Sequence, residues 1–320
     1  MKRLVIVVAV CLLALSGCAQ NQGGDEPAPV AGKGADEQSE QLKDGYRYTD
    51  ILGREIAFEA VPVKVATTYM PLWEALLMLD IKPIAAGGAE QYIATWPPFQ
   101  TLDLSGTEDI GSKDVNMEKL ASLKPDLILH QARDLSNVDL AKYEAISKVA
   151  VFGNETKMDW RLSLREVGKL MNCSEKAERV IADVEQTLKE ARESFETSYH
   201  DQTVVVLSMM AADHLVYAYR PEFYDKETGL GLNTPEGFTE DTNFTGLSLE
   251  TLVAMNPDYL FVNVFSGSEA QYEALGANPV WQSLKAVKAG QVYMITGAAH
   301  SPSPMSTVYT IEFMIDKLTK

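Results

Sequence analysis

Residues 174–199 read SEKAERVIADVEQTLKEARESFETSY, and this stretch organises the rest of the chain. Its apolar residues recur at intervals of one, three and four, with charged residues between them, which is the pattern of an amphipathic helix. Ser174 can cap the helix and Glu175 is an acid in its first turn. At about 1.5 Å per residue it would run roughly 35 Å, the width of a small domain. An ordinary surface helix is the alternative, but its position between two similar halves favours a connector between lobes.

The two halves share one sequence unit. Residues 116–129 read NMEKLASLKPDLIL and residues 248–261 read SLETLVAMNPDYLF, and they align without a gap at an offset of 132. Each predicts a helix that begins with a polar cap and an acid, Glu118 or Glu250, and that ends at Pro-Asp before a buried strand. A helix, a turn and a strand often follow one another in α/β proteins, but the shared acid and Pro-Asp indicate one unit used twice.

The remaining pattern alternates strands with helices, which predicts parallel, helix-covered sheets. In the first half we expect a hairpin at 46–58, strands at 63–68 and 82–86, and a helix at 72–79. In the second half we expect strands at 203–209, 214–219 and 291–295, and a closing helix at 306–318. The predicted fold class is α/β, with two α/β lobes, 44–172 and 201–320, joined by one long backbone helix at 173–200 and a ligand cleft between the lobes.

The first residues have the features of an export signal. Lys2 and Arg3 precede an apolar run of about 12 residues, too short to cross a bilayer but typical of a signal peptide. Small residues followed by Cys18 resemble a bacterial lipobox, in which the cysteine becomes the lipidated first residue; an ordinary secretory signal is the alternative. We therefore expect a signal peptide at 1–17 and a lipid-anchored protein at the cell membrane, facing outside the cytoplasm, on the cell surface or in the periplasm.

Composition limits what the mature chain can do. Residues 18–43 contain almost no large apolar side chains, which predicts a flexible tether. Cys11 would leave with the signal and Cys18 would carry lipid, so Cys173 alone can form neither a disulfide nor a cysteine metal cluster within one chain. The formal charge of the whole chain is −17, and without Lys2 and Arg3 it is −19, which argues against nucleic acid as a partner.

Five features together resemble the bacterial substrate-binding lipoproteins of ABC importers for ferric siderophores, haem and cobalamin. They are the lipobox, the stretch GSKDVNMEKLASLKPDLIL at 111–129, the long central helix, the stretch LSLETLVAMNPDYLFV at 247–262, and NPVWQSLKAVKAGQVYMI at 278–295. The resemblance covers residues 46–318. It implies that the long helix is a rigid backbone and that the ligand occupies the cleft. It also implies that Glu118 and Glu250 dock against arginines of a membrane permease, which works with an ATPase. The alternative is that both acids only complement helix dipoles.

Ligand contacts in such folds come from the loops that follow strands. Aromatic side chains there offer apolar area with a polar tip, and Lys or Arg can neutralise an anionic ligand. Each of these residues can also be a core or an ordinary surface residue. The predicted ligand-binding set is Tyr69, Trp73, Tyr92, Trp96, Lys113, His130, Arg133, His214, Tyr217, Arg220, Phe265 and His300.

The expected function is capture of a ferric siderophore for import, with haem or cobalamin as the second ligand class and a bare metal ion as the third. His130, His214 and His300 follow predicted strands, and together they could form a metal site, or one of them or Tyr69 an axial haem ligand. No HxH or HxxxH pair occurs, so we assign no metal and no cofactor. A lipid-anchored hydrolase lacks support, because GxSxG, HExxH and phosphate-loop motifs are missing. We therefore expect a monomeric binding protein, not an enzyme; a purely adhesive lipoprotein is a further alternative.

Overall fold

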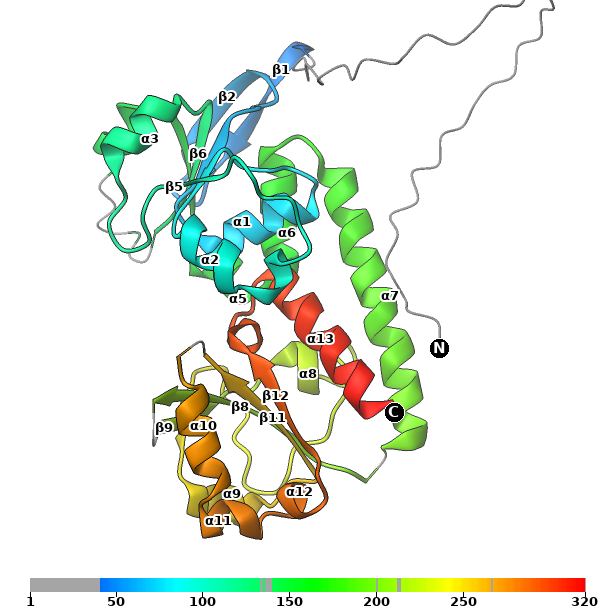
Figure 1. Cartoon of the computed structure of the whole chain (residues 1–320). Helices are drawn as coiled ribbons and strands as arrows, with labels where there is room; N and C mark the ends of the chain where they lie inside the picture. Colours follow the sequence, from blue (N-terminus) through cyan, green and yellow to red (C-terminus); the bar gives the residue numbers. More distant parts are fainter. Residues whose placement is uncertain are drawn as a thin grey trace, which may run out of the picture. The chain divides into compact units, whose positions relative to one another are not determined.

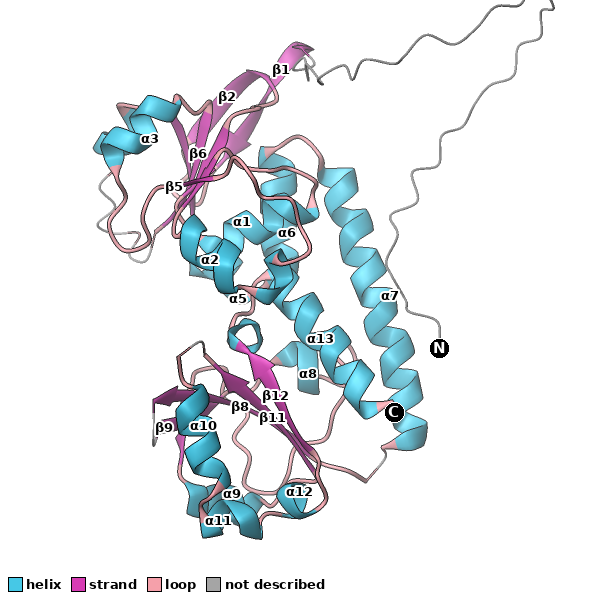
Figure 2. Ribbon diagram, in the orientation of Figure 1, coloured by secondary structure: helices cyan, strands magenta, loops and turns pink. Residues whose placement is uncertain are grey.

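Two five-stranded sheets, separated along the chain by one long helix, make up the described structure (Figure 1). It is a computed structural model that describes residues 41–132, 135, 140–199, 201–211, 214–265 and 267–319, all within one unit, Ser39–Lys320. The predicted signal peptide, Cys18 and Arg133 lie outside the described residues. The α/β fold class with two lobes is confirmed, and Figure 2 shows how strands and helices are distributed.

The first lobe begins with an antiparallel hairpin of β1 (Gln41–Thr49) and β2 (Glu55–Ala60), as predicted. Because β1 begins at Gln41, the last residues of the expected tether lie in this strand. The sheet that follows has the order β5-β4-β3-β6-β7, and every pair in it is parallel. Its strands are β3 (Val65–Thr67), β4 (Ala85–Ala86), β5 (Glu108–Asp109), β6 (Leu127–Gln131) and β7 (Lys148–Phe152).

Short helices connect these parallel strands. They are α1 (Met70–Met78), α2 (Ala89–Thr95), the 3-10 turn η1 (Pro97–Phe99), α3 (Met117–Leu123), α4 (Ala141–Glu144), α5 (Asn154–Met158) and α6 (Trp160–Leu170). Parallel strands need such crossover connections, because the chain must return to the same edge of the sheet before the next strand begins.

The second lobe holds a mixed sheet with the order β10-β9-β8-β11-β12. Strands β8 (Val204–Ala211), β11 (Tyr259–Val264) and β12 (Val292–Thr296) are parallel. In contrast to the expected parallel sheet, β9 (His214–Tyr217) is antiparallel to β8, and β10 (Thr245–Leu247) is antiparallel to β9. The reason is the short connection: two residues between Ala211 and His214 can form a hairpin but not a crossover.

The helices of the second lobe are short, apart from the last one. They are α8 (Pro221–Tyr224), α9 (Leu249–Met255), α10 (Glu269–Gly276), α11 (Pro279–Ser283), α12 (Lys285–Lys288), the 3-10 turn η2 (Gly297–His300) and α13 (Pro304–Leu318). Helix α13 packs against α1 and α6 of the first lobe as well as against η2 and α8. It therefore joins the two lobes by contact, in addition to the covalent connection through the long helix.

The repeated sequence unit is a repeated structural unit. Asn116 and Ser248 cap α3 and α9 by accepting hydrogen bonds from the backbone N–H of Lys119 (2.9 Å) and Thr251 (3.1 Å). Both helices end at a residue in the left-handed region, and both Pro-Asp turns lead into a strand, β6 or β11. Each strand pairs with the first strand of the parallel part of its lobe, β3 or β8.

The two Pro-Asp aspartates also have matching partners. Asp126 Oδ2 accepts a hydrogen bond from the backbone N–H of Lys64 (2.8 Å), just before β3. Asp258 Oδ2 accepts one from the N–H of Thr203 (2.9 Å), just before β8. In both lobes the aspartate thus satisfies a backbone donor that the sheet leaves free at the start of the neighbouring strand. Asp126 and Asp258 therefore have the same structural role in the two lobes.

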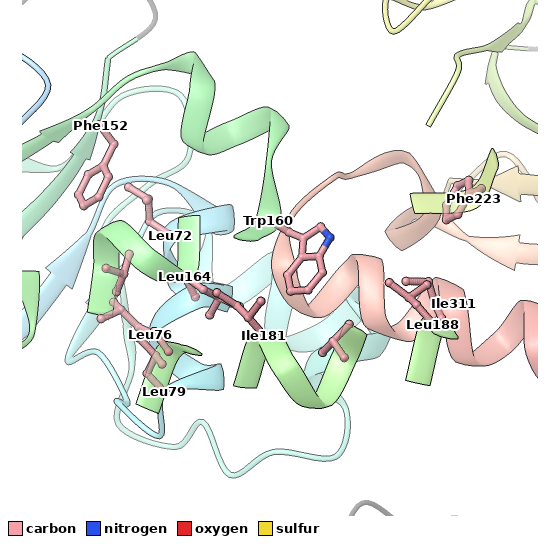
Figure 3. Close-up of a cluster of buried hydrophobic side chains, with 14 of the residues drawn as sticks. Leu72, Leu76, Leu79, Phe152, Trp160, Leu164, Ile181, Leu188, Phe223 and Ile311 are labelled. Atoms are coloured by element: carbon pink, nitrogen blue, oxygen red, sulfur yellow. The ribbon is translucent and has the colours of Figure 1, made fainter. Parts of the chain in front are cut away.

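The long helix α7 (Ser174–Ser198) has the bounds that its sequence predicted to within one residue. Its apolar face, which includes Ile181, Leu188 and Phe195, is buried in the largest hydrophobic cluster. That cluster also contains Leu72 from α1 and Ile311 from α13, so it draws side chains from both lobes (Figure 3). Each fully buried Leu or Ile contributes about 1.5–3 kcal/mol, so this cluster holds the lobes and helices together. In the described part of the chain, no helix has the length and hydrophobicity to cross a membrane.

Candidate functional site

A pocket of about 930 Å³ lies at the carboxyl ends of the strands in the first sheet. Parallel strands present their carboxyl ends at one edge, and ligands of open α/β sheets bind at such edges. The lining comes from the segments after β3, β5 and β7, from the end of β6 and from helix α4, which precedes β7. These residues are Thr68, Tyr69, Ser112, Lys113, Val115, His130, Gln131, Tyr143, Asn154 and Lys157. Of the predicted ligand-binding set, Tyr69, Lys113 and His130 meet here.

His130 is held by its neighbours on two sides. Its Nδ1 lies 3.0 Å from the hydroxyl oxygen of Thr68, and its ring packs at 4.6 Å from the ring of Tyr143. Burial, with a smaller effect from the charge of Lys142, lowers the pKa of His130 to about 4. The imidazole is therefore neutral at pH 7 and offers the pocket a ring and a hydrogen-bonding group, without positive charge.

The charge in the pocket comes from lysine. Lys113 is exposed and Lys157 is half-buried. Among the described residues that line the pocket, none is Asp or Glu. In a chain with a formal charge of −17 this local excess of positive charge is unusual, and it favours an anionic ligand.

Three rings of the second lobe form an aromatic cluster, Phe244, Phe265 and His300. The rings of Phe244 and His300 are stacked, 4.1 Å apart with an angle of 7° between their planes. Phe265 meets His300 edge-on at 5.2 Å. Phe244 keeps 48% of its surface exposed, which is unusual for so large an apolar side chain in a stacked pair.

His300 is anchored to the second sheet. Its Nδ1 lies 3.1 Å from the hydroxyl oxygen of Ser208, which accepts a hydrogen bond of 2.9 Å from the amide of buried Asn263. Burial, followed by the charges of Arg220 and Lys157, lowers the pKa of His300 to about 4. Lys157 belongs to the first lobe and lines the pocket there. The aromatic cluster faces the first lobe, because a Cβ on Gly297 would lie 3.2 Å from the Phe265 ring and 3.4 Å from the Trp96 ring.

Arg220 was expected to meet the ligand, but the structure gives it other partners. It is 8% exposed, and its guanidinium forms an ion pair with Glu222. It also donates to the backbone carbonyl of Ala299 at 3.2 Å and lies 5.1 Å above the ring of Phe223. A buried, paired cation of this kind shapes the loop that carries His300, because its hydrogen bonds fix the backbone at Ala299 and Ser301.

The predicted tryptophans lie beside the pocket rather than in it. Trp73 is fully buried, with its ring 4.4 Å from that of Phe99. Trp96 is half-buried and donates from Nε1 to Glu74 Oε1 at 2.8 Å. A Cβ on Gly297 would lie 3.4 Å from the Trp96 ring and 3.2 Å from Phe265, so Trp96 reaches the second lobe. Tyr92 packs edge-on against Trp96 at 5.5 Å.

The other predicted positions are dispersed. Tyr217 is buried, and its hydroxyl accepts a hydrogen bond from the backbone N–H of Thr239 at 3.2 Å. His214 is exposed at the start of β9. Within the described ranges, no three His, Cys, Asp or Glu side chains come close enough to hold a metal ion, and His130, His214 and His300 do not converge.

Glu118 and Glu250 occupy equivalent places in the two lobes. Each is an exposed acid in the first turn of its helix, α3 or α9. Hydrogen bonds from its own backbone N–H and from the Ser248 hydroxyl hold the pKa of Glu250 below its usual value. Both carboxylates face solvent, where they are available to a partner outside the chain.

Sequence reasoning missed Asn154 and Lys157 in the pocket and Phe244 in the aromatic cluster, and it also missed Val115 and Tyr143 in the pocket. The first two follow β7, which we did not predict, although its sequence KVAVF is a short β-branched and apolar run that indicates a strand. For Phe244, which precedes an edge strand, no sequence signal exists. Its role comes from stacking on His300, a residue 56 positions away.

A second recess, of about 1000 Å³, lies beside the β1–β2 hairpin. Four of its charged residues already pair with one another: Arg47 with Glu55, and Arg54 with Glu144 at 2.5 Å. Polar groups satisfied in this way leave little for a ligand to bind. The pocket at the strand ends, with lysines that no carboxylate of its lining neutralises, is the better candidate.

Comparison with known proteins agrees with this fold. Residues 73–299 match the family described as periplasmic binding protein. The iron-uptake system-binding protein of Bacillus subtilis is 27% identical over the full length of both chains. The Fe(3+)-citrate-binding protein of the same organism is 25% identical over 91% of this chain and 89% of its own. The crystal structure of the triscatecholate siderophore binding protein FeuA from Bacillus subtilis, complexed with ferri-bacillibactin, matches with a TM-score of 0.67 and 24% identity, covering 86% of this chain and 98% of that one.

Proposed function

Because the chain belongs to the periplasmic binding protein family, we propose that it is the extracytoplasmic substrate-binding component of an ABC importer. It captures a ferric siderophore and delivers it to the permease. The names of its relatives, which refer to iron uptake and to ferric citrate, support iron as the cargo. Haem and cobalamin remain the second ligand class.

One observation carries this proposal: a pocket of about 930 Å³ combines two lysines with polar and aromatic side chains and has no acid among its described lining residues. Its size fits a small-molecule ligand. The pocket offers hydrogen-bond donors from Lys113, Lys157, Gln131 and Asn154, which suit the oxygen-rich surface of a chelate. The protein binds the chelate as a whole, so it needs no cluster of metal-ligating side chains of its own.

Delivery uses the two equivalent acids. Glu118 and Glu250 are exposed, one on each lobe, and each is the second residue of a capped helix. A carboxylate in that position can pair with two N–H groups of an arginine. We assign both to contacts with the permease, one for each lobe. The mechanism is binding without covalent chemistry, in a monomer.

The chain is anchored to the membrane through a lipid on Cys18, after cleavage of residues 1–17. The lipobox-like run that ends at Cys18 supports this assignment. The intervening residues act as a tether, and the binding unit works on the outer side of the cytoplasmic membrane, at the cell surface or in the periplasm. Mass spectrometry of the N-terminal fragment tests the anchor, since a diacylated Cys18 is expected and an unmodified one would contradict it.

The full chain, purified in detergent, tests the function. Isothermal titration with ferric and iron-free forms of the same siderophores should give saturable binding of the ferric form of one class. The double variant Lys113→Met, Lys157→Met should weaken that binding, whereas Lys288→Met, an exposed lysine on α12, is the matched control. Turnover of ester or phosphate substrates would support the hydrolase alternative. Failure of every ferric chelate to bind would contradict the proposal.

A further inference from the structure

We infer that the chelate bound here is an anionic ferric catecholate, which presents aromatic rings together with negative charge. This inference rests on the proposed function and narrows its ligand class. Ferric trihydroxamates are aliphatic and carry little or no negative charge, and ferric citrate is anionic without rings. The question is therefore whether the site is built for charge alone or for charge and rings together.

The charge requirement comes from the first lobe. Lys113 and Lys157 both line the pocket, and its described lining contains no carboxylate that would neutralise them. The two nearby histidines do not add charge at pH 7, because burial lowers the pKa of each to about 4. Two ammonium groups in a lining without an acid are stabilised when an anion enters, and a neutral chelate gains nothing from them.

The ring requirement comes from the second lobe. Phe244 lies flat on His300, with 4.1 Å between ring centroids, and Phe265 meets His300 edge-on at 5.2 Å. Phe244 is 48% exposed, so it offers apolar aromatic surface that its own chain leaves uncovered. An aliphatic chelate would cover that surface poorly, whereas a catechol ring can stack on it or meet it edge-on.

The two requirements meet in one place. Contacts connect the pocket and its lysines to the aromatic cluster: a Cβ on Gly88 would lie 3.2 Å from Ser112, which lines the pocket, and 3.1 Å from the Tyr92 ring. Tyr92 packs on Trp96 at 5.5 Å, and a Cβ on Gly297 would lie 3.4 Å from Trp96 and 3.2 Å from Phe265 of the cluster. The pocket has rings of its own on the first lobe, Tyr69 and Tyr143. A ligand that reaches from these lysines to Phe244 therefore meets aromatic side chains from both lobes. A tris-catecholate fits this arrangement, because its rings point outward around the iron and its charge is spread over the catechol oxygens.

The neutral state of His300 supports the same ligand. The Ser208 hydroxyl accepts the amide of Asn263 and can donate its own proton to Nδ1 of His300. This leaves Nε2 of the neutral ring with the proton, as a hydrogen-bond donor. A catechol oxygen is an acceptor that such a donor can bind. Ser208 and the two phenylalanines hold the ring in place. Ligand binding therefore costs little conformational entropy at this side chain.

The test uses the full chain in detergent and three ferric probes: a synthetic hexadentate tris-catecholate, citrate and the trihydroxamate desferrioxamine. Calorimetric titration should give the tris-catecholate a dissociation constant at least about tenfold below those of the other two. Phe244→Leu keeps apolar bulk but removes the ring. It should raise the dissociation constant of the tris-catecholate about threefold to tenfold, while the dissociation constant of ferric citrate changes by less than about twofold. Phe244→Tyr keeps the ring and should keep the affinity. Thermal melts of each variant show that it is folded.

Substitution of a pocket lysine tests the charge requirement separately from the ring requirement. Lys157→Met should weaken both the tris-catecholate and citrate, by roughly tenfold, whereas Lys288→Met should change neither. Tightest binding of desferrioxamine or citrate would overturn the catecholate inference and leave the importer proposal standing. Equal weakening of citrate and tris-catecholate by Phe244→Leu would also overturn it. Binding of none of the ferric probes would contradict capture of a ferric siderophore as well, and binding of haemin in their place would support the second ligand class.

Discussion

The carboxylate of Glu74 on α1 accepts a hydrogen bond of 2.9 Å from the backbone N–H of Ser306, in the first turn of α13. Glu74 is fully buried, and its other oxygen accepts from the Ser306 hydroxyl at 2.5 Å and from Nε1 of Trp96 at 2.8 Å. Burial raises the pKa of this carboxyl. An acid of the first lobe thus caps the helix that closes the second, and it also orients Trp96 beside Phe265.

Removing this carboxylate should destabilise the protein. Glu74→Ala leaves the backbone N–H and the hydroxyl of Ser306 buried without their acceptor, whereas Trp96 Nε1 keeps the Ser306 hydroxyl at 3.1 Å. Each buried donor without an acceptor costs about 1–3 kcal/mol, so we expect a loss of roughly 3 kcal/mol or more. Glu74→Gln should cost less, because one amide oxygen remains. Urea unfolding measures both values. Glu90→Ala, an exposed acid on α2, is the control and should change stability by less than about 0.5 kcal/mol. Equal effects of Glu74→Ala and Glu90→Ala would refute the capping role.

Stability should fall as the pH is lowered from 7 towards 4, in part because of two histidines. The pKa of His130 and of His300 is about 4 in the folded chain, below the 6.5 of an unperturbed imidazole. A group whose folded pKa is depressed contributes stability above the unfolded pKa and loses it as the pH falls through the folded value. Because both rings are only half-buried, we expect each histidine to lower the free energy of unfolding by about 1–2 kcal/mol between pH 7 and pH 5.

Substitution isolates that contribution. His130→Asn and His300→Asn keep a polar side chain that does not titrate, so each should reduce the difference in unfolding free energy between pH 7 and pH 5. Glu74 has the opposite effect, because its raised pKa favours the folded state as the pH falls. An unchanged pH dependence in the double histidine variant would show that the histidines are not responsible.

Reversing the two lobe acids should separate delivery from binding. In Glu118→Lys and Glu250→Lys the ligand pocket is untouched, so the dissociation constant for the ferric chelate should stay within about twofold. Iron uptake by cells that carry either variant should fall about tenfold or more, because a lysine would face the arginines of the permease. Glu236→Lys, an exposed acid outside the repeated unit, should leave uptake normal. Normal uptake in the double variant would remove the docking assignment.

A single methyl group at Gly87 should disturb the pocket. Its Cβ would lie 2.7 Å from the backbone carbonyl oxygen of Thr68 and 3.2 Å from that of Gly111, and neither can move as freely as a side chain. Gly87→Ala should therefore cost about 2 kcal/mol or more and weaken chelate binding through Thr68. Gly246→Ala is the matched control, since its Cβ would meet no atom within 4 Å. Thermal melting and titration of the two variants compare them directly.

The sequence predicted the framework of this fold well. The amphipathic period of 174–199 is what a helix needs to bury one face, and α7 has those bounds because tertiary packing and local pattern agree. The repeated helix and Pro-Asp turn could also be predicted, because capping side chains and prolines act on the backbone within a few residues. The antiparallel β9 was not anticipated, because continuous apolar runs look alike in parallel and antiparallel central strands.

The site was less predictable, because pairwise contacts between distant segments decide it. Lys113 and Arg220 are both cations in loops after strands, yet Lys113 lines the pocket and Arg220 is buried against Glu222. Trp73 lies in the core although it is four residues from Tyr69, which lines the pocket. Local sequence gives the type of side chain, and only the packing of the lobes determines which side chains remain accessible.

The most direct measurement is a crystal structure of the protein with its ferric chelate, using anomalous scattering at the iron absorption edge. We predict one iron peak in the pocket lined by Lys113, His130 and Lys157, with the chelate also in contact with Phe244 or His300. Iron bound at the recess beside the β1–β2 hairpin, or at no defined position in the crystal, would contradict it.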